Sequence, residues 1–440
     1  MTAIDSTLAA LRRGDLAGAH TLTLRGGLRE FPPEIMGLAD TLEVLDLSQN
    51  ALSVLPDDLG RLSRLRVLFC SGNRFDRLPP VLGDCVALSQ IGFRDAGLGE
   101  IPAEALPPKL RWLTVTGNVL RDLPRAIGER PLLQKLMLSG NQLSELPVSL
   151  AGAPSLELLR LSANRFESLP PWIAELPCMA WLAWAGNPMD AARAQDARSI
   201  PWDRLALTGQ LGEGASGQVF RADWQDGAES RPVALKLFRG AMTSDGLPER
   251  EMEACLMAGD HPNLAGGLGR VTGHPDGAQG LAMRLLPEGW RALAGPPSLE
   301  SCTRDVYAPD AAFTAETVLR LAYAVACAGA HLHATDLSHG DLYAHNTLWD
   351  GAQGDAVLSD FGASAALPPP GPLRRALEGM DVLAWAILVE ELLARCPGLE
   401  AVDAIRADCL DRNSSSRPRF ADIVEELRPL VAVSLHSPSR

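Results

Sequence analysis

HGDLYAHN at residues 339–346 and SDFG at residues 359–362 are the two segments from which the second half of this chain can be interpreted. Two apolar runs lie between them, TLW and AVL, and each run is typical of a short buried strand. Loops at the ends of these strands can bring together Asp341, Asn346 and Asp360. That group offers a carboxylate that can accept the proton of an alcohol and hard oxygen ligands for Mg²⁺, as phosphoryl transfer requires.

Two further patterns lie upstream, in an order that is familiar from one family. LGEGASGQVF at residues 211–220 fits G-x-G-x-x-G-x-V, and VALK at residues 233–236 fits a strand that carries a lysine. With the H-G-D-L-x-x-x-N and D-F-G segments they resemble protein kinases, over about residues 205–430. A glycine-rich pattern alone is a weak indication, but four ordered motifs are far more specific. The resemblance implies a bilobal α+β kinase fold that uses ATP and Mg²⁺.

The resemblance also implies a role for each matching residue. Glycines in the first pattern let the backbone lie over the phosphates of ATP, and the lysine reaches those phosphates. A glutamate on the following helix holds this lysine; spacing favours Glu251, with Glu253 as the second choice. Asp341 accepts the substrate proton, while Asn346 and Asp360 bind Mg²⁺. The implied nucleotide-binding residues are Gly212, Gly214, Gly217, Val219 and Lys236, and the implied catalytic residues are Asp341, Lys236 and Glu251.

A period of about 23 residues organises the first half of the chain. Leucines such as Leu45 and Leu47 alternate along a short strand and point inward. The pattern resembles the leucine-rich repeat family, in about eight copies over residues 20–190, and implies an α/β solenoid. One column can bond backbone groups of the neighbouring coil through an asparagine amide, so the coil with Ala96 in this column is expected to be the loosest. The column reads Asn50, Asn73, Ala96, Asn118, Asn141, Asn164 and Asn187.

The strand residues on either side of the second consensus leucine are expected to face solvent on the concave side of the solenoid. Several of them are aromatic or long and apolar, and such side chains dominate protein interfaces. We therefore predict that this face binds a protein partner or substrate. The alternative is that Trp181 and its neighbours only cap the last coil or pack on the adjoining domain. The candidate contact residues are Phe69, Trp112, Met137, Leu158 and Trp181.

Composition excludes several classes of protein. The formal net charge of -14 does not suit nucleic acid or anionic membranes, which both attract basic surfaces. The 8 cysteines are scattered without C-x-x-C spacing, which favours buried thiols in a reducing compartment. Residues 1–16 lack an uninterrupted apolar segment, and the apolar runs 316–332 and 382–395 contain charged residues. We therefore expect a cytoplasmic protein without a membrane span.

The end of the repeat period and the start of the kinase motifs divide the chain. A helix that stops at Gly14 is expected to cap the open end of the repeats. The polar C-terminal residues favour disorder. The expected parts are a capping segment at 1–19, repeats at 20–190, a linker at 191–202 with helical turns at 191–195, a kinase-like domain at 203–432 and a disordered tail at 433–440.

Two features depart from the kinase pattern. Gly340 stands where many kinases carry an arginine that binds a phosphorylated activation loop. Between Gly362 and Asp381 lie only 18 residues, with Ser364 as the sole hydroxyl. Because a phosphate switch needs both a phosphosite and a receiving arginine, we expect no activation by loop phosphorylation. The short segment also leaves little support for a peptide substrate, which favours recognition by the repeats.

Three functions stay open. An ATP-dependent protein kinase, with Ser or Thr as the favoured acceptor, fits best because all five polar residues of the motifs are present. A pseudokinase or scaffold is the second possibility, and the truncated segment favours it. A kinase-fold phosphotransferase that acts on a small molecule is the third. Those five residues are Lys236, Glu251, Asp341, Asn346 and Asp360.

Overall fold

The computed structural model describes residues 3–190, 198–214, 216–240, 242–243, 245–396 and 398–436. The chain separates into two compact units, Met1–Cys178 and Met179–Arg440. The helical turns expected at 191–195 lie outside the described residues.

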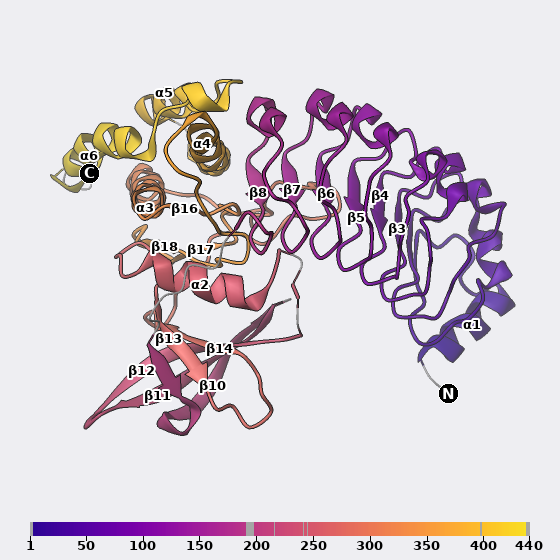
Figure 1. The fold of residues 1–440 in the computed structure, drawn as a ribbon, viewed down its shortest axis with the longest axis horizontal. Coiled ribbons are helices and arrows are strands. Elements are labelled where there is room, and N and C mark those ends of the chain that lie inside the picture. Colours follow the sequence, from indigo (N-terminus) through magenta and orange to yellow (C-terminus); the bar gives the residue numbers. More distant parts are fainter. Residues whose placement is uncertain are drawn as a thin grey trace. The chain divides into compact units, whose positions relative to one another are not determined.

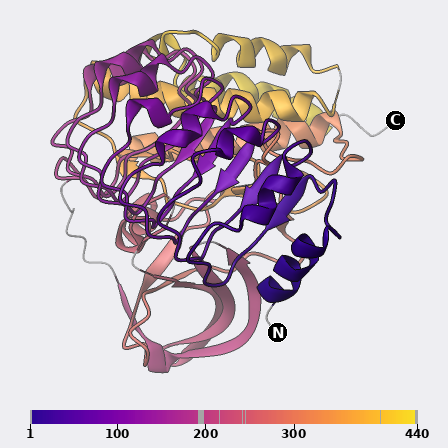
Figure 2. The ribbon, with the colours of Figure 1, turned by 90° about the vertical axis from the view of Figure 1, so that its right-hand side faces the viewer.

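The first unit is a stack of repeat coils that begins with helix α1 (Ala3–Arg13). Each coil contributes one three-residue strand, and neighbouring strands pair in parallel and in step, as Leu45 does with Leu68 (Figures 1 and 2). Short 3-10 helices return the chain between strands, and a proline often precedes or begins them. The strands are β1 (Thr21–Thr23), β2 (Val44–Asp46), β3 (Val67–Phe69), β4 (Gln90–Gly92), β5 (Trp112–Thr114), β6 (Lys135–Met137) and β7 (Leu158–Arg160). The 3-10 helices are η1 (Pro33–Leu38), η2 (Leu59–Arg61), η3 (Pro80–Asp84), η4 (Ala103–Ala105), η5 (Arg125–Glu129), η6 (Val148–Gly152) and η7 (Pro171–Glu175).

The asparagine column bonds adjacent coils to one another. Asn118 donates through Nδ2 to the backbone oxygens of Phe93 and Val115 at 2.9 and 2.8 Å. Its Oδ1 accepts the backbone N–H groups of Ala96 and Leu98. Without a side-chain amide at position 96, the backbone oxygen of Ala96 accepts the N–H of Phe75 at 2.8 Å. This bond replaces part of what an asparagine would supply, and the greater looseness of this coil stays a prediction.

The candidate contact residues differ in exposure. Phe69 and Trp112 are half-buried, and the Nζ of Lys135 lies 4.2 Å from the centroid of the Trp112 ring. The expectation that Met137, Leu158 and Trp181 face solvent is wrong, because all three are buried. Because neighbouring strands lie about 4.8 Å apart, long side chains at equivalent positions of successive coils pack against one another. The pairing sets Met137 beside Arg160 and Leu158 beside Lys135, while Trp181 is covered by a tyrosine described below.

The second unit opens with β8 (Trp181–Ala183) and contains a six-stranded sheet in the order β10-β11-β12-β14-β13-β9. Helix α2 (Pro248–Ala258) lies beside this sheet (Figure 1). Strand β9 and the turn after it lie in the region expected to be linker, and Ile200 is fully buried in the core of the sheet. Burial of the apolar Ile200 side chain therefore explains why this segment forms a strand. The elements are β9 (Ser199–Pro201), η8 (Trp202–Arg204), β10 (Leu205–Gly214), β11 (Gly217–Asp226), β12 (Glu229–Phe238), β13 (Gly267–Thr272) and β14 (Gly280–Arg284).

The rest of the second unit is mainly helical, and three of its helices lie side by side in Figure 1, namely α3 (Ala315–Ala334), α4 (Pro372–Leu393) and α6 (Phe420–His436). Helix α6 continues to His436, so the disorder expected from residue 433 is wrong for residues 433–436, and the rest of the expected tail lies outside the described residues. Among the residues that the structure describes, no helix is both long enough and apolar enough to cross a membrane. The remaining elements are β15 (Arg291–Ala292), β16 (Leu337–Ser338), β17 (Thr347–Trp349), β18 (Ala356–Leu358), β19 (Ala365–Ala366), α5 (Glu400–Asp408) and η9 (Ser414–Ser416).

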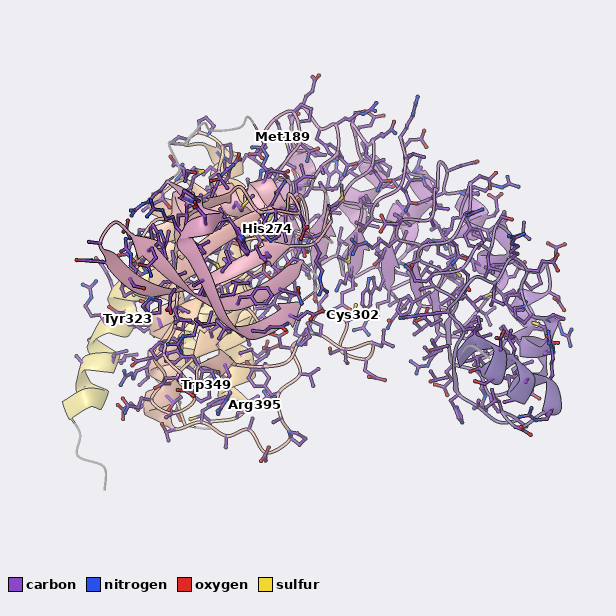
Figure 3. All side chains as sticks on the ribbon, turned by 90° about the horizontal axis from the view of Figure 1, so that it is seen from below. Met189, His274, Cys302, Tyr323, Trp349 and Arg395 are labelled. Atoms are coloured by element: carbon purple, nitrogen blue, oxygen red, sulfur yellow. The ribbon has the colours of Figure 1, made fainter. Side chains whose placement is uncertain are left out.

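A segment without regular structure precedes α3 and packs against this helical part. Phe313 lies edge-on to Trp349 of β17, with ring centroids 5.6 Å apart. Its backbone N–H donates to the backbone oxygen of Arg395, and Figure 3 shows Trp349 and Arg395 on the same side of the unit. The guanidinium of Arg395 in turn lies 3.9 Å from the ring centroid of Tyr307. These contacts fix a segment that no motif predicted.

Candidate active site

The glycine-rich loop is a tight hairpin between β10 and β11. Gly214 pairs with Gly217 at its tip, and Val219 pairs with Lys236 of β12. A side chain at position 217 would collide with the backbone oxygen of Leu237, so the sheet itself requires this glycine. A Cβ added at Gly212 or Gly214 would meet no protein atom within 4 Å. Open space therefore borders these two positions, where a backbone without side chains leaves room for a ligand.

Lys236 and Glu251 form a buried ion pair between β12 and α2. Burial would lower the pKa of Lys236, but the carboxylates of Asp360 and Glu251 outweigh burial and raise this pKa above its ordinary value. Burial and the charge of Asp360 raise the pKa of Glu251, against the opposing effect of Lys236. The second-choice residue, Glu253, instead pairs with Arg250 at 2.8 Å. Of the two glutamates, the structure brings Glu251 to the lysine.

Asp341 and Asn346 lie together in the loop between β16 and β17. The Nδ2 of Asn346 donates to the backbone oxygen of Asp341 at 2.9 Å and to its Oδ2 at 2.8 Å. The backbone N–H of Asp341 donates to the Nδ1 of His339, whose Nε2 lies 3.2 Å from the backbone oxygen of Ser359. Burial lowers the pKa of His339, in keeping with a neutral ring that donates from Nε2. The five-residue spacing thus folds into a closed, hydrogen-bonded loop.

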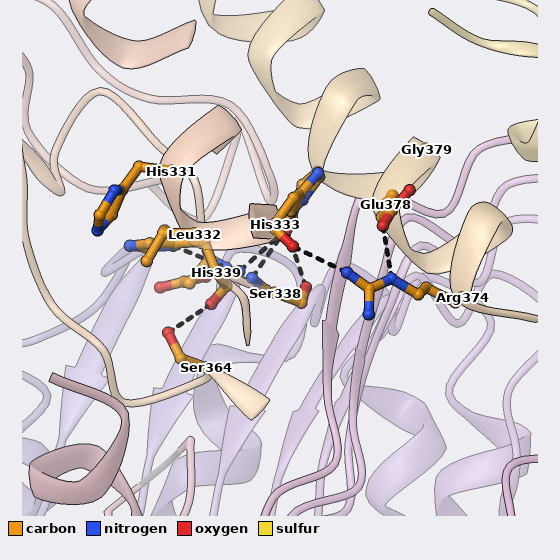
Figure 4. A network of polar contacts seen from close by, with 12 residues as sticks. His331, Leu332, His333, Ser338, His339, Ser364, Arg374, Glu378 and Gly379 are labelled. Carbon is orange, nitrogen blue, oxygen red and sulfur yellow. Dashed lines mark hydrogen bonds and ion pairs between the residues drawn. The ribbon is translucent and has the colours of Figure 1, made fainter. Parts of the chain in front are cut away.

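Asp381 on α4 fixes the start of this loop. Figure 4 shows the polar contacts in this region, with His333, Ser338 and His339 labelled. Its carboxylate accepts the backbone N–H groups of His339 and Gly340 at 2.9 and 3.0 Å. It also accepts the hydroxyl of Ser338 and lies 3.0 Å from the Nε2 of His333. Burial would raise the pKa of Asp381, but the hydrogen bonds from His333 and the backbone outweigh burial and lower it. The ionised carboxylate of Asp381 therefore holds the start of the loop in place, because the surrounding donors all form hydrogen bonds to it.

Asp360 joins the two halves of the site. Its φ of 60° places it in the left-handed region, and its Oδ1 accepts the N–H of Gly362 at 3.1 Å. A Cβ added at Gly362 would lie 3.2 Å from the Oδ1 of Asp360 and 3.6 Å from the Oε2 of Glu251. The negative charges of Asp360 and Asp341 both raise the pKa of His339, against the larger opposing effect of burial. Residues far apart in the chain thus converge on one place.

The donor set suits Mg²⁺ held together with phosphate oxygens. Asn346 uses its Nδ2 on Asp341, so the Oδ1 of its amide is the atom for a cation, and Asp360 adds a carboxylate. Mg²⁺ is commonly bound by one or two carboxylates with substrate phosphates completing the shell, so a complete protein cage is not needed. In keeping with this, no three His, Cys, Asp or Glu side chains of the described residues gather as a metal site.

Two contacts of the loop were not predicted from motifs. The Nδ1 and backbone N–H of His345 both bond Asp305, which lies in the irregular segment before α3. Trp181 of β8 stacks on Tyr343. No pattern pointed to Asp305. For Trp181 the only signal was an aromatic residue in a repeat column, which predicts burial against another surface as readily as a solvent-facing contact.

Comparison with known proteins agrees with this geometry. Residues 205–387 match the family of protein tyrosine and serine/threonine kinases. Residues 41–62 and 108–166 match leucine-rich repeat models. The chain joins leucine-rich repeats to a protein kinase domain. The resemblance noted in the sequence and the expected fold class are therefore confirmed.

The chain is also similar to curated proteins. It is 30% identical over 157 residues to fibroblast growth factor receptor 1 of Xenopus laevis, covering 33% of this chain and 19% of that protein. It is 25% identical over 294 residues to ephrin type-A receptor 8 of Mus musculus, covering 55% and 27%. A third relative is the probable inactive serine/threonine-protein kinase roco10 of Dictyostelium discoideum, 30% identical over 112 residues, covering 24% and 4%. The chain thus spans less than a third of the length of each.

Proposed function

We propose that this protein is an ATP-dependent protein kinase. The observation that carries the proposal is the Lys236–Glu251 ion pair with the carboxylate of Asp360 close enough to both to raise their pKa values. Such a pair and the D-F-G aspartate must be in place together for kinase activity. All five polar residues of the motifs lie in this arrangement, which supports an active enzyme over a scaffold.

In this proposal each residue acts on one part of the reaction. Lys236 binds the α and β phosphates, and the backbone at Gly212, Gly214 and Gly217 covers them, with Val219 beside the nucleotide. Asp341 orients the acceptor hydroxyl and takes its proton. Asn346 and Asp360 hold Mg²⁺, which neutralises charge that develops on the transferred phosphoryl group. Asp381 keeps the loop that carries Asp341 and Asn346 in one conformation.

We propose Ser or Thr as the acceptor and the repeats as the recognition domain. The short segment after Gly362 supports recognition outside the cleft, because α4 begins at Pro372 and little chain remains to bind a peptide. Phe69 and Trp112, which are half-buried, are the remaining candidates for contact on the concave columns. The cysteines of the described residues form no disulfide, which supports our proposal that the protein works in the cytoplasm, a reducing compartment.

A pseudokinase or scaffold is the second candidate, because the same short segment is the observation that favours it. Transfer of radiolabel from γ-³²P-ATP separates the two. The acceptor is a degenerate peptide mixture containing Ser, Thr and Tyr, and the proteins are the wild type, Asp341→Ala and Asp310→Ala, a variant of an exposed aspartate of the same domain. The kinase proposal expects transfer by the wild type and Asp310→Ala only. Equal background counts from all three would favour the scaffold, and labelling of low-mass acceptors alone would favour a small-molecule phosphotransferase.

A further inference from the structure

The last repeat coil, residues 179–190, belongs to the same compact unit as the kinase domain. The ring of Trp181 in this coil stacks on that of Tyr343, with centroids 4.2 Å apart and planes inclined by 6°. The indole Nε1–H of Trp181 donates to the backbone oxygen of Leu342 at 2.9 Å. Because Leu342 and Tyr343 directly follow Asp341, one buried side chain fixes both the backbone and a ring immediately after the proposed catalytic base.

The same coil touches the catalytic loop at a second point. A Cβ added at Gly340 would lie 2.6 Å from the backbone oxygen of Leu182 and 2.8 Å from that of Ala363. Gly340 also has a φ of 70°, so a side chain here meets both strain and close backbone neighbours. The loss of the usual arginine at this position is therefore what lets the coil approach the loop.

The coil also contacts α2, the helix that carries Glu251. The Nη2 of Arg250 donates to the backbone oxygen of Asp190 at 3.3 Å, and its Nε lies 3.8 Å from the Asp190 carboxylate. Arg250 and Asp190 are both largely buried. One coil thus reaches the loop of Asp341 on one side and the helix of Glu251 on the other. These are the two elements whose placement determines whether a kinase site is assembled.

The segment after Gly362 offers no exposed hydroxyl on which a phosphate could order the catalytic loop. Its one hydroxyl, that of Ser364, is buried and donates to the backbone oxygen of His339 at 3.1 Å. Position 340 also carries no arginine that would receive an added phosphate. Some other contact must keep the loop in order, and the coil supplies one.

We propose that the last repeat coil takes the place of activation-loop phosphorylation, with Trp181 as a positioning residue that holds Asp341 through Tyr343 and Leu342. This inference rests on the proposed kinase function. The kinase domain is then held in its active arrangement by the residues of this coil. Because Trp181 contacts the residues that follow Asp341, its effect falls on kcat, the turnover of bound ATP.

The test compares full-length Trp181→Ala and Trp181→Phe with wild type. Trp172→Ala serves as the matched control, because Trp172 is a half-buried tryptophan on η7 in the first unit. Hydrogen exchange of the peptide that covers residues 340–346 reports the order of the loop without requiring activity. Transfer from γ-³²P-ATP to the degenerate peptide mixture gives kcat and the KM for ATP.

Trp181→Ala is expected to speed exchange in residues 340–346 and to lower kcat by about 10- to 100-fold, with the KM for ATP changed less than about twofold. Trp181→Phe keeps a stacked ring and is expected to recover most of the turnover, while Trp172→Ala behaves as wild type. Unchanged exchange and kcat in folded Trp181→Ala would overturn the inference. A higher kcat would overturn it as well, since the coil would then be an inhibitory cover. If the wild type transfers no phosphate, the kinase proposal fails, and exchange alone still decides whether Trp181 orders the loop.

Discussion

Asp305 accepts two hydrogen bonds from His345, one from Nδ1 at 2.7 Å and one from the backbone N–H at 2.9 Å. The Asp305 side chain is fully buried, and His345 directly precedes the proposed metal ligand Asn346. A segment outside every motif therefore fastens the end of the catalytic loop, while Asp381 fastens its start.

Replacing Asp305 by alanine should loosen this loop. The change leaves a half-buried imidazole and a backbone N–H without their acceptor, so the free energy of unfolding should fall by about 2–4 kcal/mol. Urea denaturation measures it. Asp310→Ala, on the exposed part of the same segment, is the control and should change stability by less than about 0.5 kcal/mol. Equal midpoints for the two variants would show that the Asp305–His345 contact does not contribute.

Lys236→Met should remove phosphoryl transfer while leaving the protein folded. The variant lacks the cation that the proposal places on the ATP phosphates, and loss of such electrostatic stabilisation lowers turnover by about 100-fold or more. Single-turnover transfer from γ-³²P-ATP measures the effect. Lys109→Met, at an exposed lysine of the repeats, provides the comparison. Turnover within about threefold of wild type for Lys236→Met would contradict the role given to this lysine.

Stability should depend on pH through Glu391 of α4. Burial and the neighbouring charge of Asp305 raise the pKa of Glu391 to about 7, against the opposing effects of the Asp305 backbone N–H and Arg304. The folded state then binds the proton more tightly than the unfolded state, whose pKa is near 4.5. The free energy of unfolding contributed by this group therefore falls as pH rises from about 4.5 to 7 and is constant above that window.

Glu391→Gln removes this titration. Relative to wild type, the variant should gain about 1–3 kcal/mol in the free energy of unfolding between pH 5 and pH 8. Thermal melts at both pH values test it, with Glu390→Gln at the exposed neighbouring position as control. A difference between variant and wild type that is the same at both pH values would argue against a raised pKa.

Asn118→Ala should destabilise the repeats. The substitution leaves the N–H groups of Ala96 and Leu98 and the oxygen of Phe93 without the amide that bonds them, while the oxygen of Val115 keeps the Nδ2 of Asn141 at 3.0 Å. Because these groups are buried, we expect a loss of about 2–4 kcal/mol, measured by chemical denaturation. Arg121→Ala, at an exposed position of the same coil, should be nearly neutral. A neutral effect of Asn118→Ala would mean that water replaces the amide.

Ser364 should carry no phosphate in active protein. Its hydroxyl is buried and bonded to the backbone oxygen of His339, so another kinase cannot reach it while the domain is folded. Phosphopeptide mapping of protein purified in an active state tests this. An activating phosphate at Ser364 would show that the segment opens and that regulation follows the usual route of loop phosphorylation.

The sequence by itself determined the repeats, the kinase domain and the residues of the candidate site. The repeats were predictable because each coil buries leucines at equivalent positions, so the leucines recur in the sequence with a fixed period. Lys236, Asp341 and Asp360 were predictable because motif spacing along the chain is set by local strand and loop geometry. Glu251 needed the structure to separate it from Glu253, since both lie on one helix and only packing decides which one meets the lysine.

Only the tertiary structure decided the contacts made between distant segments. For Trp181 the repeat column left exposure and packing on another surface both open, and the side chain is buried because Tyr343, 162 residues further along the chain, lies against it. Ile200 belongs to a short polar segment that is expected to be a linker. In the structure the six-stranded sheet buries its side chain, and the segment around it forms strand β9. Asp305 belongs to no pattern at all. Such contacts form where two surfaces fit together and exclude water. Neither the fit nor the exclusion of water produces a period or a motif spacing in the sequence.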